Sequence, residues 1–460
     1  MKTSLSKGIR LVLIANIINL GFNLVANFLL PKYLPVVSYS EIKTFQLYLS
    51  YIGVFHFGFI DGIYLQYGGR NLDTIARNQL KLCLNTFRVF QLVISVIGTI
   101  VSLLLKDNIL LFVSLAVLPY NTTMLLKQLY QATGEFRLYG KVMNYTTVST
   151  FAVNIVLLMI FHCSKSNLYI ISYLIIYLLI WLILENGFAN FQISEHTKLF
   201  SWKLLVETIY DGFLLMLGNF ASIFQTGLDR WFVKALMDNI AFAQYSFAVS
   251  MESILNVAVA PITITMYNYF CVHNEKEDVS RICKGIIIFA CGIVACAFPA
   301  KFILEYFLKS YLPSSGVLFL LFGAQIFYII NKSAFVNLYK AKRKQRAYFI
   351  KLVIVIVIGF LLNILIYGIF RHKEAFAIGT LITSIVWFVV NLSDFPETGI
   401  GLKECTFLGI EIILFLCCGY LLNSVLGGIV YCVGSILLSY IFLRETVNFY
   451  CGMLVKKSHR

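Results

Sequence analysis

Two short stretches of the chain, LYQATGEFRLYG at residues 129–140 and LYKAKRKQRAYF at residues 338–349, share one pattern. Leucine, tyrosine, alanine, arginine and tyrosine recur at the same offsets in both stretches, without a gap. The paired positions are Leu129 and Leu338, Tyr130 and Tyr339, Ala132 and Ala341, Arg137 and Arg346, and Tyr139 and Tyr348. Each stretch ends one apolar run and leads into the next, so the pattern indicates that one part of the fold occurs twice.

The composition around these stretches is that of a membrane protein. Of the 460 residues, 59% are hydrophobic and 13% are charged, and the mean hydropathy is +0.82. Soluble domains carry about 25% charged residues. Apolar runs of 18 or more residues recur along the chain. This pattern predicts an all-α, polytopic membrane protein.

The apolar runs, separated by charged or turn-rich breaks, predict about fourteen membrane spans. The loops between them are short, and the longest polar break covers residues 190–205. The predicted spans cover residues 8–30, 42–67, 82–105, 109–131, 142–162, 167–189, 206–228, 240–268, 285–308, 313–338, 348–370, 375–393, 405–423 and 425–444.

The distribution of lysine and arginine predicts the orientation in the membrane. Placing the N-terminus inside puts most basic residues in inner segments and adjoining helix ends, as cytoplasmic loops require. Both termini are then cytoplasmic, which needs an even number of spans. The formal net charge of +15 follows from this asymmetry, so we expect no nucleic-acid partner.

The two similar stretches follow the fourth and the tenth predicted span, both on the cytoplasmic side. We call them the joints and expect Arg137, Tyr139, Arg346 and Tyr348 to form part of them. Two parallel six-helix repeats would place a transport path between the halves. The alternative is that any inner loop contains basic residues and interfacial tyrosines. The predicted parts are an N-terminal lobe (1–190), a cytoplasmic linker (191–205), a C-terminal lobe (206–393) and two further spans with a cytoplasmic tail (394–460).

Polar residues inside the first and seventh spans are candidates for lining a cavity, because amides and charges are costly in hydrocarbon. The first span presents four asparagines within an 80° arc, and the seventh, its repeat partner, presents a similar stripe. Hydrogen bonding between helices is the alternative explanation, and Asp229 with Arg230 would also suit an interfacial pair. The residues are Asn16, Asn19, Asn23 and Asn27, and then Asp211, Asn219, Ser222, Thr226 and Asp229.

Further polar residues lie in the second, eighth and tenth spans. Asp61 stands between Gly58 and Gly62, which permit close helix approach, and His56 is nearby. Asp61, Glu252 and Asp229 are candidates for binding a coupling cation or proton, or for pairing with basic neighbours. The spacing of Gln325, Lys332 and Tyr339 predicts one helix face. Lys332 would either attract an anionic head group or neutralise a carboxylate such as Glu252.

Catalytic and metal-binding patterns do not appear. The sequence has no GxSxG, HExxH or Walker A motif, no paired carboxylates and no Cys/His cluster with metal spacing. We therefore expect no catalytic residues, no metal and no cofactor, and a protein that is not an enzyme.

The sequence resembles the bacterial polysaccharide flippases of the MOP superfamily, which translocate O-antigen or capsule repeat units. The residues that carry the resemblance are YSEIKTFQLYLSYIGVFHFGFIDGIYLQYGG from residue 39, LDRWFV and AFAQYSFAVSM in the second half, and the LYQATG and LYKAKRK joints. The resemblance covers essentially the whole chain, including the last two spans. It implies two MATE-like six-helix lobes around a cavity that opens alternately to either side.

The resemblance also implies a cargo, a polyprenyl-diphosphate-linked oligosaccharide for lipopolysaccharide O-antigen, capsule or exopolysaccharide. Membrane lipids, a polysaccharide polymerase and chain-length machinery would be partners in a bacterial inner membrane. One alternative is a cation-coupled multidrug or small-molecule antiporter of the same superfamily. Many such exporters have a carboxylate in the first span. This chain has asparagines there instead, which makes the antiporter alternative less favoured. A membrane polymerase or ligase is the alternative of another class, for which the outer loops are too short.

Overall fold

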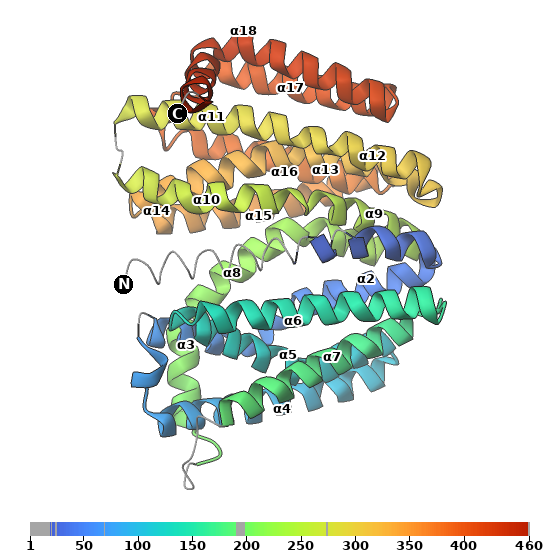
Figure 1. Ribbon diagram of the computed structural model, residues 1–460, viewed down its shortest axis with the longest axis vertical. Coiled ribbons are helices and arrows are strands. Elements are labelled where there is room, and N and C mark those ends of the chain that lie inside the picture. The colour runs from blue at the N-terminus through green and yellow to red at the C-terminus, as the bar shows by residue number, and fades with distance from the viewer. Residues whose placement is uncertain are drawn as a thin grey trace. The chain divides into compact units, whose positions relative to one another are not determined.

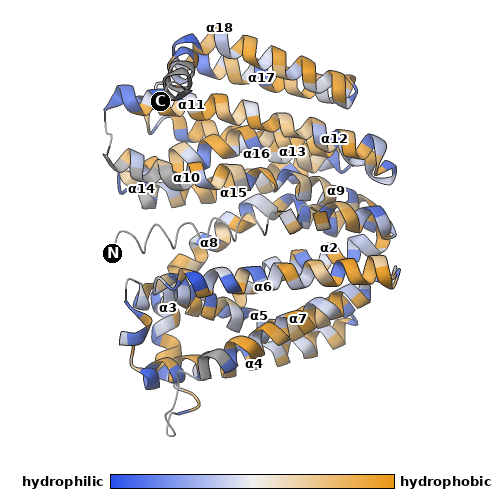
Figure 2. Cartoon of the chain, viewed as in Figure 1, coloured by the Kyte–Doolittle hydropathy of each residue, from blue (hydrophilic) through white to orange (hydrophobic). Residues whose placement is uncertain are grey.

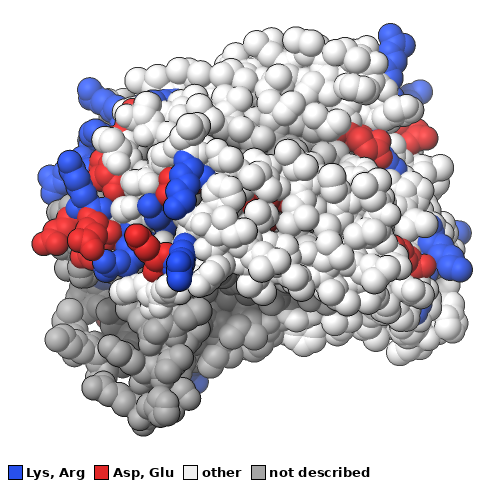
Figure 3. Space-filling view, turned by 90° about the horizontal axis from the view of Figure 1, so that it is seen from above, with Lys and Arg blue, Asp and Glu red and all other residues white. Residues whose placement is uncertain are grey.

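The computed structural model describes residues 19, 21–23, 25–68, 70–189, 198–272 and 275–458. Eleven helices in these residues are long and apolar enough to cross a membrane. Figure 2 shows hydrophobic residues along the middle of helices such as α15 and α17, with hydrophilic residues toward their ends. On the face drawn in Figure 3, most charged side chains gather at two opposite ends, and few lie between them. The chain is a multi-pass, all-α membrane protein, as its sequence predicts.

The described helices form two compact units, Met1–Phe224 and Gln225–Arg460 (Figure 1). In the first unit, α5 packs against α2, α3, α4, α6 and α7, and so it is central to that unit. The elements are α2 (Val36–Ser50), η1 (Ile52–His56), α3 (Phe59–Tyr67), η2 (Leu72–Thr74), α4 (Arg77–Leu105), α5 (Asn108–Ala132), α6 (Phe136–Ile155), η3 (Val156–Ile160), α7 (Ser166–Ala189) and α8 (Trp202–Leu236), which continues into the second unit.

In the second unit the central helix is α13, which is buried from Val317 to Ile330 and packs against α9, α11, α16 and α17. Two further helices, α17 and α18, pack against each other and against the unit. The elements are α9 (Asn239–Glu252), α10 (Leu255–Val272), α11 (Lys276–Ile293), η4 (Val294–Cys296), α12 (Ala297–Tyr306), η5 (Lys309–Ser314), α13 (Ser315–Ile330), η6 (Asn331–Phe335), α14 (Val336–Ala341), α15 (Gln345–Phe370), α16 (Glu374–Leu392), η7 (Pro396–Thr398), α17 (Leu402–Leu421) and α18 (Ser424–Ser458).

The order of neighbours is similar in the two units. In the first, α5 contacts α2, α4 and α7, and in the second, α13 contacts α9, α11 and α16. The pair α6 and α7 corresponds to the pair α15 and α16 in the same way. This agreement supports the repeat that the joints suggest, while the boundaries of the predicted lobes stay a prediction.

The two joints have the same backbone. The Glu135 amide donates to the Tyr130 carbonyl at 2.8 Å, and the Lys344 amide donates to the Tyr339 carbonyl at 2.8 Å. These bonds close the turn with which many helices end, in which the residue before the donor is left-handed. The repeated phrase therefore encodes the same helix end twice.

The predicted second and eighth spans are each interrupted. In the first unit, α2 ends at Ser50 and α3 begins at Phe59, with Phe57 and Gly58 at positive φ between them. In the second unit, α9 ends at Glu252 and α10 begins at Leu255. The predicted first span lies partly outside the described residues. These three predicted spans are missing from the eleven, so the number fourteen stays a prediction.

Candidate functional site

The break between α2 and α3 exposes backbone carbonyls that no helix satisfies. The amide nitrogen of Gln91 on α4 donates to the Phe55 carbonyl at 3.2 Å. The amide nitrogen of Asn121 on α5 lies 3.4 Å from the Ile52 carbonyl and 2.7 Å from the Gln91 amide oxygen. Backbone groups in a membrane need such partners inside the protein. The two buried amides therefore stabilise the interruption, and sequence reasoning did not single them out.

Asp61 lies just after this break, on the first turn of α3. The Asn219 amide of α8 donates to Asp61 Oδ1 at 3.0 Å, and His56 Nε2 lies 3.7 Å from Asp61 Oδ2. The Gly58 amide donates to His56 Nδ1 at 3.0 Å, which makes Nδ1 the acceptor and leaves Nε2 to face Asp61. The structure thus brings together His56, Asp61 and Asn219.

Glycines allow α3 and α8 to approach closely at this point. A Cβ atom on Gly62 would lie 2.1 Å from the Thr208 carbonyl oxygen, and one on Gly212 would lie 2.1 Å from the Gly58 carbonyl oxygen. Neither separation is possible for a real Cβ atom. The close helix approach that the sequence predicts at Gly58 and Gly62 is therefore confirmed.

A cavity of about 240 Å³ lies beside His56, Asp61 and Asn219 within the first unit. Its polar lining includes His56, Asp61, Asn121, Gln128 and Asn219. The rest is largely apolar. An acid, an imidazole and three amides offer both donors and acceptors, which suits a hydroxyl-rich or cationic ligand. Gln128 was also missed, although an amide inside an apolar run is a signal that could have found it.

In the second unit, the polar cluster forms where α9 ends at its own break. The Gln325 amide of α13 donates to the Glu252 carboxylate. Lys332, on the π-helical turn η6, places its ammonium 5.5 Å from the centroid of the Tyr328 ring. Among the described residues, no carboxylate oxygen lies within 4.0 Å of this ammonium. Lys332 is thus near Glu252 but forms no direct ion pair with it.

Asp229 of α8 belongs to the same unit and is buried, with 4% of its surface exposed. The Tyr245 hydroxyl donates to Asp229 Oδ2 at 2.5 Å, and the Thr380 hydroxyl does so at 3.3 Å. The backbone amide of Arg230 donates to Asp229 Oδ1 at 2.8 Å. Asp229 is therefore not an exposed interfacial residue, and hydroxyl groups from α9 and α16 hold its carboxylate.

The asparagines of the predicted first span contact neighbouring helices where they are described. The Asn19 amide lies 3.5 Å from Asn144 of α6 and accepts a hydrogen bond from Thr147. Asn27 accepts a hydrogen bond from the Lys43 ammonium at 3.0 Å. Asn23 is exposed, and Asn16 lies outside the described residues. In this structure, Asn19 and Asn27 show the helix-to-helix bonding that the sequence left open as an alternative.

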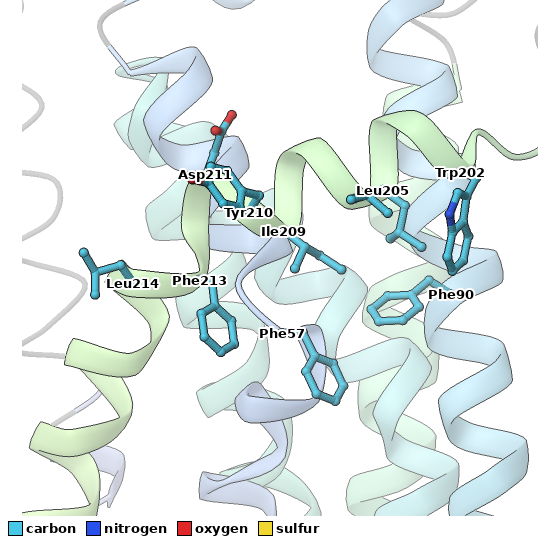
Figure 4. A pocket seen from close by; sticks show the side chains of 10 residues that line it. Phe57, Phe90, Trp202, Leu205, Ile209, Tyr210, Asp211, Phe213 and Leu214 are labelled. Carbon is cyan, nitrogen blue, oxygen red and sulfur yellow. The ribbon is translucent and has the colours of Figure 1, made fainter.

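The polar residues of the predicted stripe on α8 lie in different surroundings. Asn219 bonds to Asp61, Asp229 is buried, and Ser222 and Thr226 are exposed. Asp211 is exposed at the edge of an apolar groove of about 960 Å³ in the first unit. Figure 4 shows the Asp211 carboxylate pointing away from Phe57 and Phe90, which line that groove.

The face predicted for Gln325, Lys332 and Tyr339 does not continue along the whole helix. The π-helical turn η6 lies between α13 and α14 and changes the angular spacing of the residues after it. Gln325 contacts Glu252, whereas the Tyr339 hydroxyl donates to Asp394 and contacts Asn391 at 3.2 Å. The prediction of one face is therefore wrong for Tyr339.

At the joints, Arg137 and Arg346 are exposed. The Lys127 ammonium lies 5.5 Å from the Tyr139 ring centroid, and the Tyr348 ring lies 5.7 Å from the Tyr339 ring.

A charged pair just beyond α16 contacts the second joint. Lys351 Nζ lies 2.7 Å from Asp394 Oδ2, on the same carboxylate that receives the Tyr339 hydroxyl. Burial alone would raise the pKa of Asp394, but the hydrogen bonds from Lys351 and Tyr339 outweigh it and hold its pKa below the usual value. Asp394 is therefore ionised at neutral pH.

Two solved structures resemble this chain over most of its length. A structure of the lipid II flippase MurJ, in an inward closed conformation, matches with a TM-score of 0.69 at 15% identity and covers 94% of this chain and 99% of that one. A multidrug resistance MATE family transporter of the MOP superfamily, in an inward-facing conformation, matches with a TM-score of 0.55 at 12% identity and covers 84% and 99%.

At the level of sequence, no family model and no curated protein matches this chain. Identities this low show a shared fold and nothing finer. Both similar structures are those of a flippase or a transporter, and neither is that of an enzyme. The resemblance drawn from the sequence is thus confirmed at the level of the fold, which this chain shares with a lipid II flippase and with a MATE transporter of the MOP superfamily.

Proposed function

We propose that this protein is a flippase that moves polyprenyl-diphosphate-linked oligosaccharide repeat units from the cytoplasmic to the outer leaflet by alternating access. The observation that carries the proposal is the extent of the structural match. The similarity to a lipid II flippase covers 94% of this chain, against 84% for the multidrug transporter. Lipid II is itself a lipid-linked substrate.

The described polar groups support a cargo with sugar and phosphate parts. A diphosphate with several sugars cannot cross about 30 Å of hydrocarbon unaided. Each unit places polar side chains at an interrupted helix, a feature that marks binding sites in transporters. The amides around Asp61 suit sugar hydroxyls, and Lys332 supplies a cation for the diphosphate. A small number of cations favours release as well as binding, since many would trap the head group.

The remaining predicted residues have secondary roles in this proposal. Asp61, Glu252 and Asp229 are the groups for binding a coupling cation or proton. We also propose contacts with the sugar part of the cargo for Asn23, Ser222 and Thr226, which are exposed, and for Asn16. The joint residues Arg137 and Arg346 contact anionic head groups at the cytoplasmic surface.

The cellular setting belongs to the same proposal. The protein lies in the bacterial inner membrane with both termini in the cytoplasm, and it supplies a polysaccharide polymerase and its chain-length machinery. Lipopolysaccharide O-antigen, capsule or exopolysaccharide would be the final product.

Replacing Lys332 with Ala tests the proposal in cells. We expect surface polysaccharide to fall strongly while the protein remains in the membrane at normal abundance. Lys301 is the matched control, since its ammonium donates to the Gly419 and Leu422 carbonyls at 2.8 and 2.6 Å. Its replacement should lower abundance instead, because a buried structural contact is lost.

Two measurements distinguish the outcomes, surface polysaccharide and sensitivity to toxic compounds, both normalised to protein abundance. Normal polysaccharide in the Lys332→Ala strain would remove Lys332 from the mechanism. Altered sensitivity to toxic compounds, with polysaccharide intact in a deletion strain, would favour the antiporter.

A further inference from the structure

Glu411 is a buried acid that the proposed transport site does not use. It lies on α17, outside both predicted six-helix lobes, where α17 packs against α18 and α18 packs against α11. None of its surface is exposed. The Tyr431 and Ser435 hydroxyls lie near its carboxyl group, but neither carboxyl oxygen accepts a hydrogen bond of good geometry, and no basic group among the described residues lies within 4.0 Å of it.

The groups around Glu411 come from two neighbouring helices. Tyr431 and Ser435 of α18 and Cys291 of α11 are its titratable or polar neighbours. The Tyr431 hydroxyl donates its proton to the Cys291 carbonyl at 2.7 Å. Because a phenol has one proton, the Tyr431 oxygen is left as an acceptor on the side of Glu411. The Phe415 ring packs on Tyr431 at 5.1 Å and adds to the apolar surroundings.

A second glutamate on the same helix shows how an ionised carboxylate is held in this protein. Glu404, two turns before Glu411, is also buried, with 5% of its surface exposed. Its Oε1 lies 2.9 Å from Lys284 Nζ, and its Oε2 accepts the Gly401 amide at 2.9 Å. Glu404 therefore has a cation and a backbone donor, both of which Glu411 lacks within the described part of the chain.

An ionised carboxylate with no cation, no backbone donor and no well-formed hydrogen bond is very costly in an apolar interior, whereas a neutral carboxylic acid is much less so. A neutral acid also carries an O–H group that can donate to the Tyr431 oxygen. We propose that Glu411 is a proton-binding site built by α11, α17 and α18, and that it carries its proton in the folded protein. Exchange of that proton requires these three helices to separate.

Infrared spectroscopy of the purified protein in lipid nanodiscs tests this directly, because a protonated carboxyl group has a separate C=O band. The wild-type band should lose a component in the Glu411→Gln variant and keep it in the Glu404→Gln control. Exchanging potassium for sodium at constant pH and ionic strength should leave that component unchanged. The Tyr431→Phe variant, which removes the acceptor but keeps the acid, should shift the frequency of the same component.

The proposal fails if Glu411→Gln and Tyr431→Phe both leave the carboxyl band as it is in the wild type. It also fails if sodium abolishes the component, since Glu411 would then be an ionised cation ligand. If Glu411→Gln does not fold, the frequency shift in Tyr431→Phe decides the question alone. None of these results depends on the transported substrate, so they are separate from the test of the proposed function.

Discussion

The two joints have the same hydrogen bonds and differ at the residue that those bonds place in the left-handed region. In the first joint this residue is Gly134, at φ 78°, and in the second it is Arg343, at φ 56°. Left-handed backbone is free for glycine and costs other residues about 1 kcal/mol. The second joint also carries an ion pair between Lys342 and Glu397. The two joints thus share one backbone conformation but differ in the residues and contacts that determine its stability.

The two interrupted spans also differ in whether glycine occurs where the helix breaks. The break in the first unit depends on glycines that let α3 approach α8, whereas the break in the second lies at Ser253–Ile254 and contains no glycine.

The largest expected effect is therefore that of Gly62→Ala in the first unit. The new methyl group would overlap the Thr208 backbone, so the helices must separate, at a cost of about 3 kcal/mol. Gly218→Ala, on α8 with open space around it, should be close to neutral. Thermal unfolding and membrane abundance of the two variants check this prediction. Similar behaviour of both variants would show that α3 and α8 do not pack closely.

The next effect compares the two acids at the breaks, through Asp61→Asn and Glu252→Gln. Each change removes a group that can ionise and keeps its shape, so we expect transport to fall on the order of tenfold with little change in abundance, as the loss of about 1.4 kcal/mol of contact energy would cause. Surface polysaccharide per unit of protein is the readout. Full activity of either variant would show that transport does not need the acid of that unit.

A smaller and opposite pair of effects is expected at the left-handed positions. Gly134→Ala should destabilise the protein by about 1 kcal/mol, because the methyl group meets no neighbour and only the backbone is strained. Arg343→Gly should relieve similar strain and raise stability by less than about 1 kcal/mol. Unfolding temperatures of the two variants measure both. Changes in unfolding temperature of the same sign in both variants would contradict the left-handed conformation of one joint.

The smallest effect concerns Asp394, which accepts a hydrogen bond from Tyr339 of the second joint. Its lowered pKa means that it contributes stability above the pKa of the unfolded chain, near 3.8, and that this contribution is lost as the pH falls. Asp394→Asn should cost less than about 1 kcal/mol at neutral pH, since its partners are partly exposed. Unfolding at pH 7 and pH 4 should show the difference shrinking with acid. A difference that grows would mean that the carboxylate is not held by Lys351.

Sequence reasoning reached the features that depend on local pattern. The membrane class follows from apolar runs, the joints from a repeated phrase, and the close approach at Gly62 from glycine spacing. It missed Gln91 and Asn121, because their role depends on carbonyls freed by a break in another helix.

The same limit explains the residues that were assigned to one face. The π-helical turn at Asn331–Phe335 separates Tyr339 from Gln325, and an ideal helix period does not foresee such a turn. The partners of Asn27 and Asp229, on other helices, depend equally on tertiary packing.

The most direct measurement uses the purified protein in vesicles that contain a polyprenyl-diphosphate-linked oligosaccharide. A membrane-impermeant glycosidase added outside reports how much of the lipid is exposed in the outer leaflet. We predict that the wild-type protein exposes the whole pool and that the Lys332→Ala variant leaves about half of it protected, as empty vesicles do. Equal protection in vesicles with wild-type protein and in empty vesicles would contradict lipid-linked oligosaccharide transport.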